Sequence, residues 1–264
     1  RSSRGLGDVY KRQLKDFHWK EDIDLVNFLG ALITAVTMPH WGRGHPFLAI
    51  NGNKPGVGKS TLARTLGIIA EGEEPSTVSY TADDAEFEKQ LATRVEAGDR
   101  VIIIDNAKTK GTIESAVLER CISDTRLNFR RLGSNTAISR PVNDLLICLT
   151  MNLTNLGADL RRRALPVNLE LEGNVRAVTY SRADPLGYVL QHRLAIVAEV
   201  AGLVQVWVDR GRPAIDAPAR HSTSQLWAQT VDAILQTNGF GGFLSNFDAS
   251  EHAFDPRYQL MVAI

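Results

Sequence analysis

A glycine-rich stretch in the first quarter of the chain, GNKPGVGKST at residues 52–61, has the residue types of a loop that binds phosphate. Gly56 and Gly58 let the backbone turn its N–H groups toward an anion, and Lys59 can reach the terminal phosphates of a nucleotide. The Ser60 hydroxyl is a suitable ligand for Mg²⁺. An expected strand precedes the loop and an expected helix follows it, which is the context that such a loop requires. We therefore expect ATP and Mg²⁺ to be bound by Asn53, Pro55, Gly56, Val57, Gly58, Lys59, Ser60 and Thr61.

The loop departs from the usual motif G-x-x-x-x-G-K-[ST] at the first position of that motif. Residue 53, where the motif has glycine, is asparagine, and Gly52 stands one position earlier. Asn53 starts the expected turn, and asparagine tolerates left-handed backbone better than most residues. The alternative is a glycine-rich turn with a structural use only.

A carboxylate that could hold Mg²⁺ ends the apolar run VIIID at residues 101–105. Such a run is typical of a strand buried on both faces, and we expect its terminal Asp105 to share the metal with Ser60. The alternative is an aspartate that starts a turn. Asn106 follows, where many such ATPases have a glutamate that activates water. An amide takes up no proton, so Asn106 could only orient the water, which puts the rate of hydrolysis in question.

Two further positions have residue types that stabilise phosphate charge. Asn152 ends the apolar run CLTMN, where such ATPases have a polar residue that contacts the γ-phosphate; the alternative is an ordinary asparagine at a strand end. Three arginines follow at 161–163. Their position favours arginine fingers that reach the nucleotide of a neighbouring subunit, and the alternative is a solvated basic run. The catalytic candidates are Lys59, Asp105, Asn106, Asn152, Arg162 and Arg163.

The elements that must position these residues alternate between strands and helices. Apolar runs predict strands at 45–50, 76–80, 101–105, 145–152 and 165–171. The segments between them have helical spacing or, at 126–142, the pattern of a hairpin. This alternation predicts an α/β fold, a P-loop NTPase three-layer sandwich with a mainly parallel sheet, followed by a helical C-terminal part. We expect a helical lead-in at 14–46, the ATPase core at 47–172 and an incomplete helical domain at 173–264.

Composition excludes several classes of protein. Hydrophobic residues make up 44% of the chain and charged residues 23%, which is ordinary for a globular protein, and the formal net charge is zero. Cys121 and Cys148 lie in apolar runs and indicate buried thiols in a reducing compartment. The apolar run at 23–38 is too short to span a bilayer, and we find no signal peptide. These features predict a cytoplasmic protein without a membrane partner.

Residues 1–13 are a special case. The string DVYKRQ at 8–13 is the translation of GAT GTG TAT AAG AGA CAG, which resembles the end of a transposon adapter used in library sequencing. We expect this segment to be an adapter artefact outside the fold; the alternative is a basic N-terminal tail.

The motifs GNKPGVGKST, VIIIDN, FRRLG and LTMNLTNLGADLRRR together resemble the ATPase domain of phage, plasmid and integrative-element replication proteins. Those proteins are AAA+ ATPases related to superfamily 3 helicases, often joined to primase modules, and the resemblance covers roughly residues 20–246. It implies an ATP-hydrolysing DNA helicase or translocase that forms a homo-oligomer, a ring of six. It also assigns the phosphate site to Gly56, Gly58, Lys59 and Ser60, the magnesium site to Asp105, the sensor to Asn152 and the finger to Arg162 or Arg163.

DNA binding would have to come from a local patch, because the net charge is zero. In ring helicases a hairpin at this stage of the fold projects into the central channel. Single-stranded DNA would meet Arg126, Arg130 and Arg131 there, and Phe129 could stack on a base. The alternative is an amphipathic strand whose Phe129 fills the core and whose arginines are solvated or bind nucleotide phosphate.

Two other functions remain open from the sequence. A P-loop kinase or another phosphotransferase would use the arginines at 161–163 as a lid that clamps a small phosphorylated substrate. A nucleotide-gated scaffold would bind ATP with little turnover, which Asn106 permits.

Overall fold

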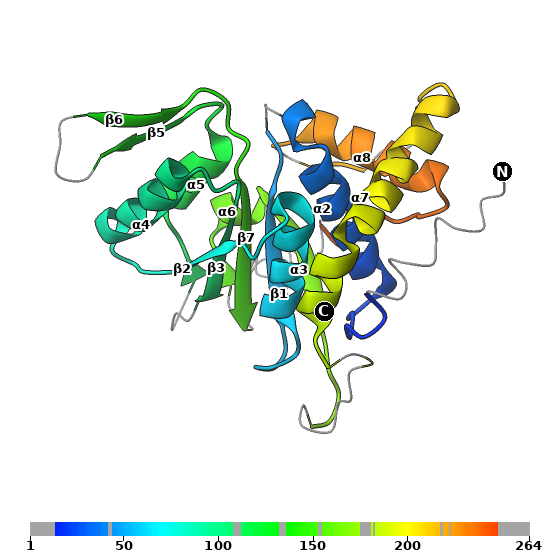
Figure 1. Cartoon of the computed structure of the whole chain (residues 1–264), viewed down its shortest axis with the longest axis horizontal. Helices are drawn as coiled ribbons and strands as arrows, with labels where there is room; N and C mark the ends of the chain where they lie inside the picture. The colour runs from blue at the N-terminus through cyan, green and yellow to red at the C-terminus, as the bar shows by residue number, and fades with distance from the viewer. Residues whose placement is uncertain are drawn as a thin grey trace, which may run out of the picture.

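A five-stranded parallel sheet forms the centre of the protein. The computed structural model describes residues 14–41, 44–107, 112–131, 136–152, 155–174, 181, 183–216, 219–221 and 223–247. The strands follow the order β2-β3-β7-β1-β9, and every neighbouring pair is parallel. Their bounds are β1 Phe47–Gly52, β2 Ser76–Ser79, β3 Val101–Ala107, β7 Leu146–Asn152 and β9 Ala164–Leu169. All five carboxyl ends therefore lie at one edge of the sheet, at the bottom of Figure 1.

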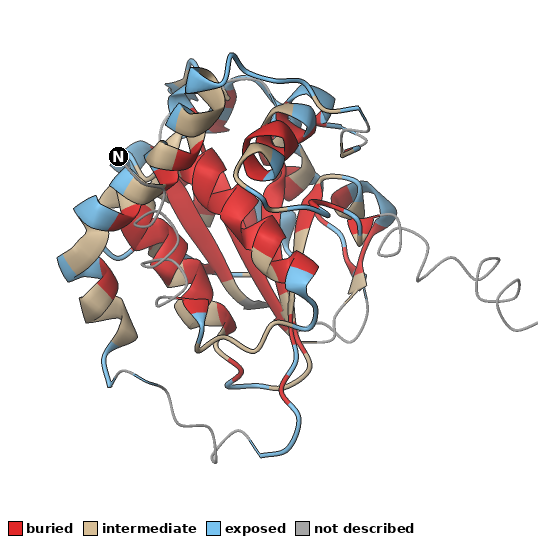
Figure 2. Cartoon of the chain, turned by 90° about the vertical axis from the view of Figure 1, so that its right-hand side faces the viewer, coloured by how far each residue is buried: buried red, intermediate tan, exposed pale blue. Residues whose placement is uncertain are grey.

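Helices cover both faces of this sheet, which confirms the three-layer α/β architecture. One face packs against α2 Asp22–Val36, α3 Lys59–Glu71, α7 Pro185–Asp209 and α8 Gln225–Thr237. The other face packs against α4 Asp84–Ala97, α5 Ala116–Ser123 and the short α6 Ala158–Arg161. Figure 2 shows the buried strands between these layers.

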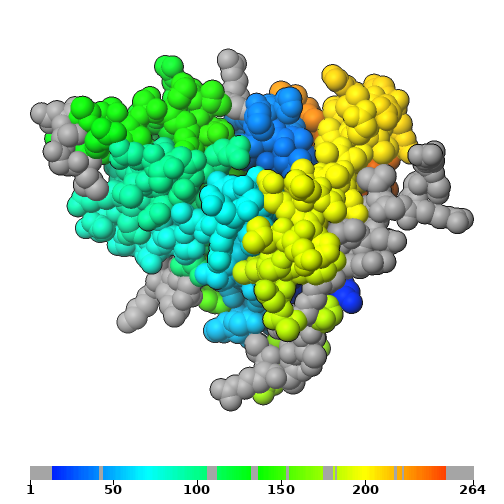
Figure 3. Space-filling model, in the orientation of Figure 1, coloured from blue at the N-terminus to red at the C-terminus, as the bar shows by residue number. Residues whose placement is uncertain are grey.

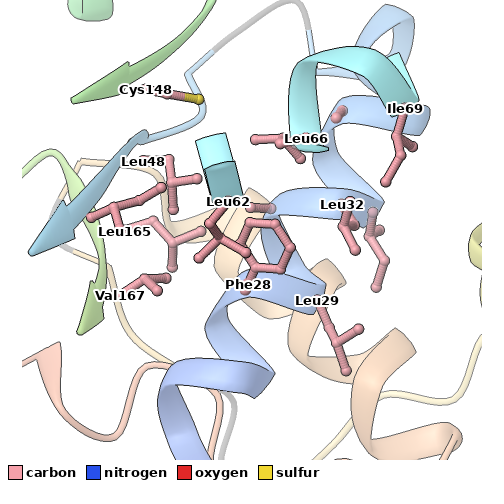
Figure 4. Close-up of a cluster of buried hydrophobic side chains, with 14 of the residues drawn as sticks. Phe28, Leu29, Leu32, Leu48, Leu62, Leu66, Ile69, Cys148, Leu165 and Val167 are labelled. Atoms are coloured by element: carbon pink, nitrogen blue, oxygen red, sulfur yellow. The ribbon is translucent and has the colours of Figure 1, made fainter. Parts of the chain in front are cut away.

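Alternation along the strands explains why both layers form. On β1, Leu48 and Ile50 belong to the core beneath α2 and α3, whereas Phe47 and Ala49 belong to the opposite core. A strand whose successive side chains are all apolar must be covered on both sides. Figure 4 shows Leu48 close to Leu62 of α3.

The helix ends follow ordinary capping chemistry. Asp83 caps α4 by accepting hydrogen bonds from the N–H groups of Ala85 and Glu86. The helix α7 begins at Pro185, and the Asp184 carboxylate accepts the N–H of Gly187. The first turn of α3 instead begins at Gly58, with a left-handed φ of 100°.

The C-terminal helices share one core with the segment before the sheet. Phe28 of α2, Leu66 of α3, Val200 of α7 and Trp227 of α8 all belong to the same buried cluster. Figure 3 shows α7 lying beside α3 on one face of the molecule. The expected lead-in at 14–46 and the helical part after residue 172 therefore pack on the same face of the central sheet.

The edge strand β9 has its outward backbone groups satisfied by side chains and by the chain before α2. The Ala164 carbonyl accepts from His221 Nε2, and the Pro166 carbonyl accepts from Asn27 Nδ2. The N–H of Asn168 donates to the buried Asp24 carboxylate at 2.8 Å. Unpaired strand edges invite association with other chains, and these contacts close the edge.

Two short pairs of strands lie outside the main sheet. The hairpin consists of β5 Leu127–Arg130 and β6 Ala137–Arg140, which run antiparallel as the sequence predicts. The strands β4 Thr112–Ile113 and β8 Asn155–Leu156 form a two-residue parallel pair that the sequence did not predict. A single turn of 3₁₀-helix, Met38–His40, follows α2.

One helix of the described chain, α7, is long and apolar enough by length and composition to cross a membrane. Its buried residues Val189, Ile196, Val200 and Leu203 pack in the core beside α3. Both cysteines are free and buried, as expected, and burial raises the pKa of each thiol to about 12.

Candidate nucleotide-binding site

The glycine-rich loop joins β1 to α3 at the carboxyl edge of the sheet. Gly56 and Gly58 have φ values of 83° and 100°, a region that side-chain-bearing residues rarely adopt. A Cβ atom at Gly52 would lie 2.6 Å from Val57 Cγ1 and 2.9 Å from Lys59 Cδ. Val57 is buried in the core and anchors the loop from below. The loop therefore has the tight backbone that phosphate binding requires.

Asn53 has a different role from the one that its sequence position suggested. Its φ is not positive, so the turn does not use the left-handed conformation that asparagine tolerates. Its side chain instead forms two hydrogen bonds of 3.1 Å with the backbone of Leu171, one through Nδ2 and one through Oδ1. These bonds tie the start of the loop to the chain after β9, which a glycine could not do.

Lys59 lies at the first position of α3 with its ammonium group held above the strand ends. Its Nζ donates to Asn152 Oδ1 at 2.7 Å and to the Lys54 carbonyl at 3.1 Å. Burial lowers the pKa of Lys59, and the nearby Asp105 carboxylate raises it. Because β7 lies between β1 and β3, the position expected for Asn152 brings its amide directly to this lysine.

Asp105 accepts two hydroxyl hydrogen bonds on a single oxygen. Ser60 Oγ donates to Asp105 Oδ1 at 2.7 Å, and Thr150 Oγ1 donates to the same atom at 2.5 Å. The carboxylate and the serine hydroxyl that the sequence predicts as metal ligands are thus in contact. Oxygen donors of this kind suit Mg²⁺, which takes few protein ligands and completes its shell with phosphate and water.

Thr150 is the member of this site that the sequence reasoning missed. It is fully buried on β7, two residues before Asn152, and the β3–β7 register shifts beside it between Ile104 and Ala107. A polar residue inside the otherwise apolar run LICLTM was the available signal. Asn106 lies in β3, and its side chain lies outside the described part of the structure.

A cavity of about 350 Å³ opens beside the loop. Its walls include Gly56, Ser60 and Thr61 on one side and Phe17, Pro185 and Val189 on the other. The volume is within the range of small-molecule sites. Residues from the segment before the sheet and from α7 therefore extend the phosphate loop into a pocket with an apolar wall. Pro55, the remaining predicted loop residue, is exposed.

No family model and no curated protein matches the chain. Among solved structures, the chain is similar to the A form apo structure of the NrS-1 C terminal region. The two share 17% identity with a TM-score of 0.54, over 88% of this chain and 50% of that chain. This likeness supports a P-loop NTPase fold, with a mainly parallel central sheet and a helical part. The chain spans about half the length of the first structure it matches.

A second solved structure, the X-ray structure of JCV Helicase, matches at 13% identity and a TM-score of 0.44. That alignment covers 94% of this chain and 67% of that chain.

The arginines predicted as fingers lie at the opposite edge of the sheet from the glycine-rich loop. The Arg163 carbonyl accepts the N–H of Phe47, the first residue of β1, whereas the loop follows the last residue, Gly52. At roughly 3.3 Å per residue, the six residues of β1 separate the two edges by about 17 Å or more. The structure therefore does not bring Arg162 and Arg163 to Lys59 of the same chain.

The adjacent arginines differ in their contacts. Arg162 is exposed and pairs with Asp159. Arg163 donates from Nε to Ser123 Oγ at 2.9 Å and from Nη1 to the Asp159 carbonyl at 2.7 Å. Arg161 donates to the Leu156 carbonyl. Arg163 and Arg161 thus hold α6 against its surroundings, and Arg162 is the more accessible guanidinium.

The hairpin extends from the far end of the molecule beside α4, at the upper left of Figure 1. Leu127 and Phe129 are buried in the core beneath α4 and α5, which excludes Phe129 from stacking on a base. Arg126, Arg130 and Arg131 are exposed, and Arg131 pairs with Glu96 of α4. The alternating burial predicted for an amphipathic strand is therefore what the structure shows.

Proposed function

We propose that this domain binds and hydrolyses ATP and uses the energy to move along or unwind DNA, as an AAA+-type module in replication of a phage or mobile element. The observation that supports this most is the convergence of Lys59, Ser60, Asp105, Thr150 and Asn152 at one edge of the sheet. These side chains come from two neighbouring strands, β3 and β7, and from the first turn of α3. Each has the chemistry that phosphoryl transfer requires.

In this proposal the chain's own residues do the following. The loop N–H groups and Lys59 hold the phosphates, and Asn152 orients both the lysine ammonium and the γ-phosphate. Ser60 and Asp105 would hold Mg²⁺, which would supply positive charge beside the phosphate oxygens. Asn106 orients the attacking water without taking its proton, so the proposed turnover is slow.

The arginines complete the site from a second copy of the chain. Because Arg162 and Arg163 lie at the edge opposite Lys59, they would serve the nucleotide of a neighbour. Repeating such a head-to-tail contact closes a ring, and we propose six subunits. The proposed DNA contact is single-stranded and uses Arg126, Arg130 and Arg131 of the hairpin.

The two alternative functions make different demands on the same residues. A phosphotransferase that uses Arg161–Arg163 as a lid needs them above its own phosphate loop, and their position at the opposite edge disfavours this reading. A nucleotide-gated scaffold needs binding without turnover. Replacement Asn106→Glu would raise hydrolysis if a missing base limits the rate, and would leave it unchanged in a scaffold.

The deciding experiment measures ATP binding and ATP turnover with and without single-stranded DNA. Lys59→Ala should abolish both binding and turnover, because the phosphates lose their buried cation. Lys54→Ala is the matched control, since Lys54 is in the same loop but donates to the Gly173 carbonyl. DNA-stimulated turnover in the parent supports a translocase; tight ATP binding by Lys59→Ala would refute the assigned site.

A further inference from the structure

A buried histidine outside the nucleotide site contacts the chain that bears the arginines. His221 is 1% exposed and lies before α8, with its ring centroid 5.8 Å from that of Trp227 and 4.8 Å from that of Phe247. Its Nε2 is 3.2 Å from the carbonyl oxygen of Ala164, the residue that follows Arg163. Thr223 Oγ1 is 3.4 Å from the Arg162 carbonyl and 3.4 Å from His221 Nδ1. No step proposed above uses either side chain.

We propose that His221 and Thr223 are positioning residues that hold the turn bearing Arg162 and Arg163 in the geometry a neighbouring subunit requires. The inference rests on the proposed trans-acting role of these arginines. In this inference, the helical C-terminal part determines the orientation of the Arg162 and Arg163 side chains.

The hydrogen-bonding chemistry supports this arrangement. A carbonyl oxygen accepts only, so Nε2 of His221 must carry the hydrogen that bonds to Ala164. That tautomer leaves Nδ1 as an acceptor for the Thr223 hydroxyl. The hydroxyl has one hydrogen and two acceptors within 3.4 Å, Nδ1 and the Arg162 carbonyl, so it can serve both in turn. Burial lowers the pKa of His221 to about 4, which keeps the ring neutral and the tautomer fixed near neutral pH.

The same segment is tied to α8. The Ala219 N–H donates to the buried Asp232 carboxylate at 2.7 Å, and the His221 N–H donates to Gln225 Oε1 at 3.2 Å. These two bonds fix the backbone around His221 to the side chains of Asp232 and Gln225. This is a continuous path of hydrogen bonds from the helical part to the arginines.

A purely structural reading also exists. His221 satisfies an outward carbonyl of the edge strand β9, as Asn27 does two residues further along at Pro166. On that reading its loss would lower stability without changing the arginines. The two readings differ in what a second copy can restore. If His221 positions the arginines, a neighbouring subunit with intact arginines restores turnover; if His221 only adds stability, it does not.

The first test measures the turn directly, without ATP hydrolysis. Amide hydrogen exchange of a peptide covering residues 158–165 is compared in the parent, His221→Leu, His221→Gln and Thr223→Val. Removing one hydrogen bond should speed exchange there about 2- to 10-fold in His221→Leu and Thr223→Val. His221→Gln retains an N–H of similar reach and should stay near the parent. Asn238→Ala is the control, because Asn238 ties α8 to the Leu203 carbonyl of α7.

The second test is complementation between copies. Lys59→Ala subunits have intact arginines and no nucleotide site, whereas His221→Leu subunits have an intact nucleotide site and misplaced arginines. Alone, His221→Leu should lose about 10- to 100-fold in turnover with ATP affinity unchanged. Mixed rings should turn over faster than either variant alone.

The outcomes separate the inference from the proposed function. Unchanged exchange at 158–165 in folded His221→Leu and Thr223→Val overturns the positioning role, as does an equal change in Asn238→Ala. Parent-like turnover in Arg162→Ala combined with Arg163→Ala overturns the finger function instead, and the exchange measurement still decides whether His221 holds the turn.

Discussion

At the scale of single residues, the site depends on a carboxylate whose orientation is set from two sides. Ser60 donates to Asp105 from α3, and Thr150 donates to the same oxygen from β7. Thr150 is fully buried, so no water competes for its hydroxyl. Groups that hold a ligating carboxylate in place commonly affect a metal site almost as strongly as the ligands do.

Thr150→Val tests this arrangement with almost no change in side-chain volume. The variant should fold, since a methyl group replaces the hydroxyl in an apolar core. Turnover and Mg²⁺ dependence should weaken about 10-fold or more, because Asp105 loses one of its two fixed donors. Thr150→Ser retains the hydroxyl and is the control. Parent-like magnesium titration of ATP turnover in Thr150→Val would show that Ser60 alone suffices.

The sequence predicts most of this site because the motif residues are consecutive or follow apolar runs. Asn53 and Thr150 show where it falls short. The Asn53 side chain bonds to Leu171, 118 positions away in the chain, and no local pattern encodes such a contact. Thr150 interacts across a register shift between β3 and β7, whose position depends on how the strands pair. Long-range geometry, rather than residue type, decides both roles.

At the scale of elements, the hairpin β5–β6 combines a structural face with a polar one. Leu127 and Phe129 point into the core, and Arg140 ties the second strand to the end of α4 through the Val95 and Asp99 carbonyls. Arg140 is therefore a structural residue. Arg126, Arg130 and Arg131, on and beside the first strand, are exposed and are the ones proposed to contact a phosphate backbone.

Arg130→Ala combined with Arg131→Ala should weaken binding of single-stranded DNA and leave ATP binding unchanged. The loss should shrink as salt rises, because fewer counterions are released from the DNA by the variant. Titration of a fluorescent oligonucleotide at several salt concentrations measures this. Arg64→Ala is the control, since Arg64 is on α3 and pairs with Glu74. Loss of ATP binding would instead place these arginines in the nucleotide site.

Elements buried on both faces are also those that the sequence locates best. The expected strands at 101–105 and 145–152 coincide with most of β3 and β7, because nearly every residue there is buried and apolar. The pair β4–β8 has only two residues in each strand and depends on where α6 places Leu156. Such short pairs form because tertiary packing brings the two segments together, and a local sequence pattern does not predict them.

At the scale of the whole molecule, stability should depend on pH through buried histidines. Burial lowers the pKa of His221 from 6.5 to about 4. Between these two pH values, His221 is therefore protonated in the unfolded chain and neutral in the folded chain. The contribution of neutral His221 to the free energy of unfolding is fully present above pH 6.5 and is lost as the pH falls toward 4. It amounts to about 3 kcal/mol at most, from 1.36 kcal/mol per pKa unit.

Urea unfolding of the parent and of His221→Gln between pH 7 and pH 4 measures this contribution. The free energy of unfolding should fall less steeply with decreasing pH in the variant. Some slope should remain, because burial also lowers the pKa of His45. Identical slopes in the two proteins would mean that His221 is protonated equally in the folded and unfolded states.

In the proposed function, the arrangement of the two sheet edges makes the nucleotide site dependent on a second copy of the chain. The phosphate loop lies at the carboxyl edge of β1, and the Arg163 carbonyl accepts a hydrogen bond from its amino edge. Arg162 is exposed, whereas Arg163 is anchored to Ser123 and to Asp159. Arg162 is therefore better placed to reach out, and Arg163 is better placed to support the turn.

Arg162→Ala should lower turnover about 10³-fold or more with ATP affinity unchanged, because an arginine that acts only on developing phosphate charge contributes to rate rather than to binding. Arg163→Ala should lower both turnover and melting temperature, since it also breaks the contact between α6 and α5. Asp159→Asn is the matched control: it weakens the ion pair of Arg162 without removing the guanidinium, so turnover should not fall. In the parent, turnover per subunit should rise with protein concentration until assembly is complete. Turnover that is independent of concentration in a strictly monomeric sample would refute the shared site, because one chain cannot bring its own arginines across the length of β1.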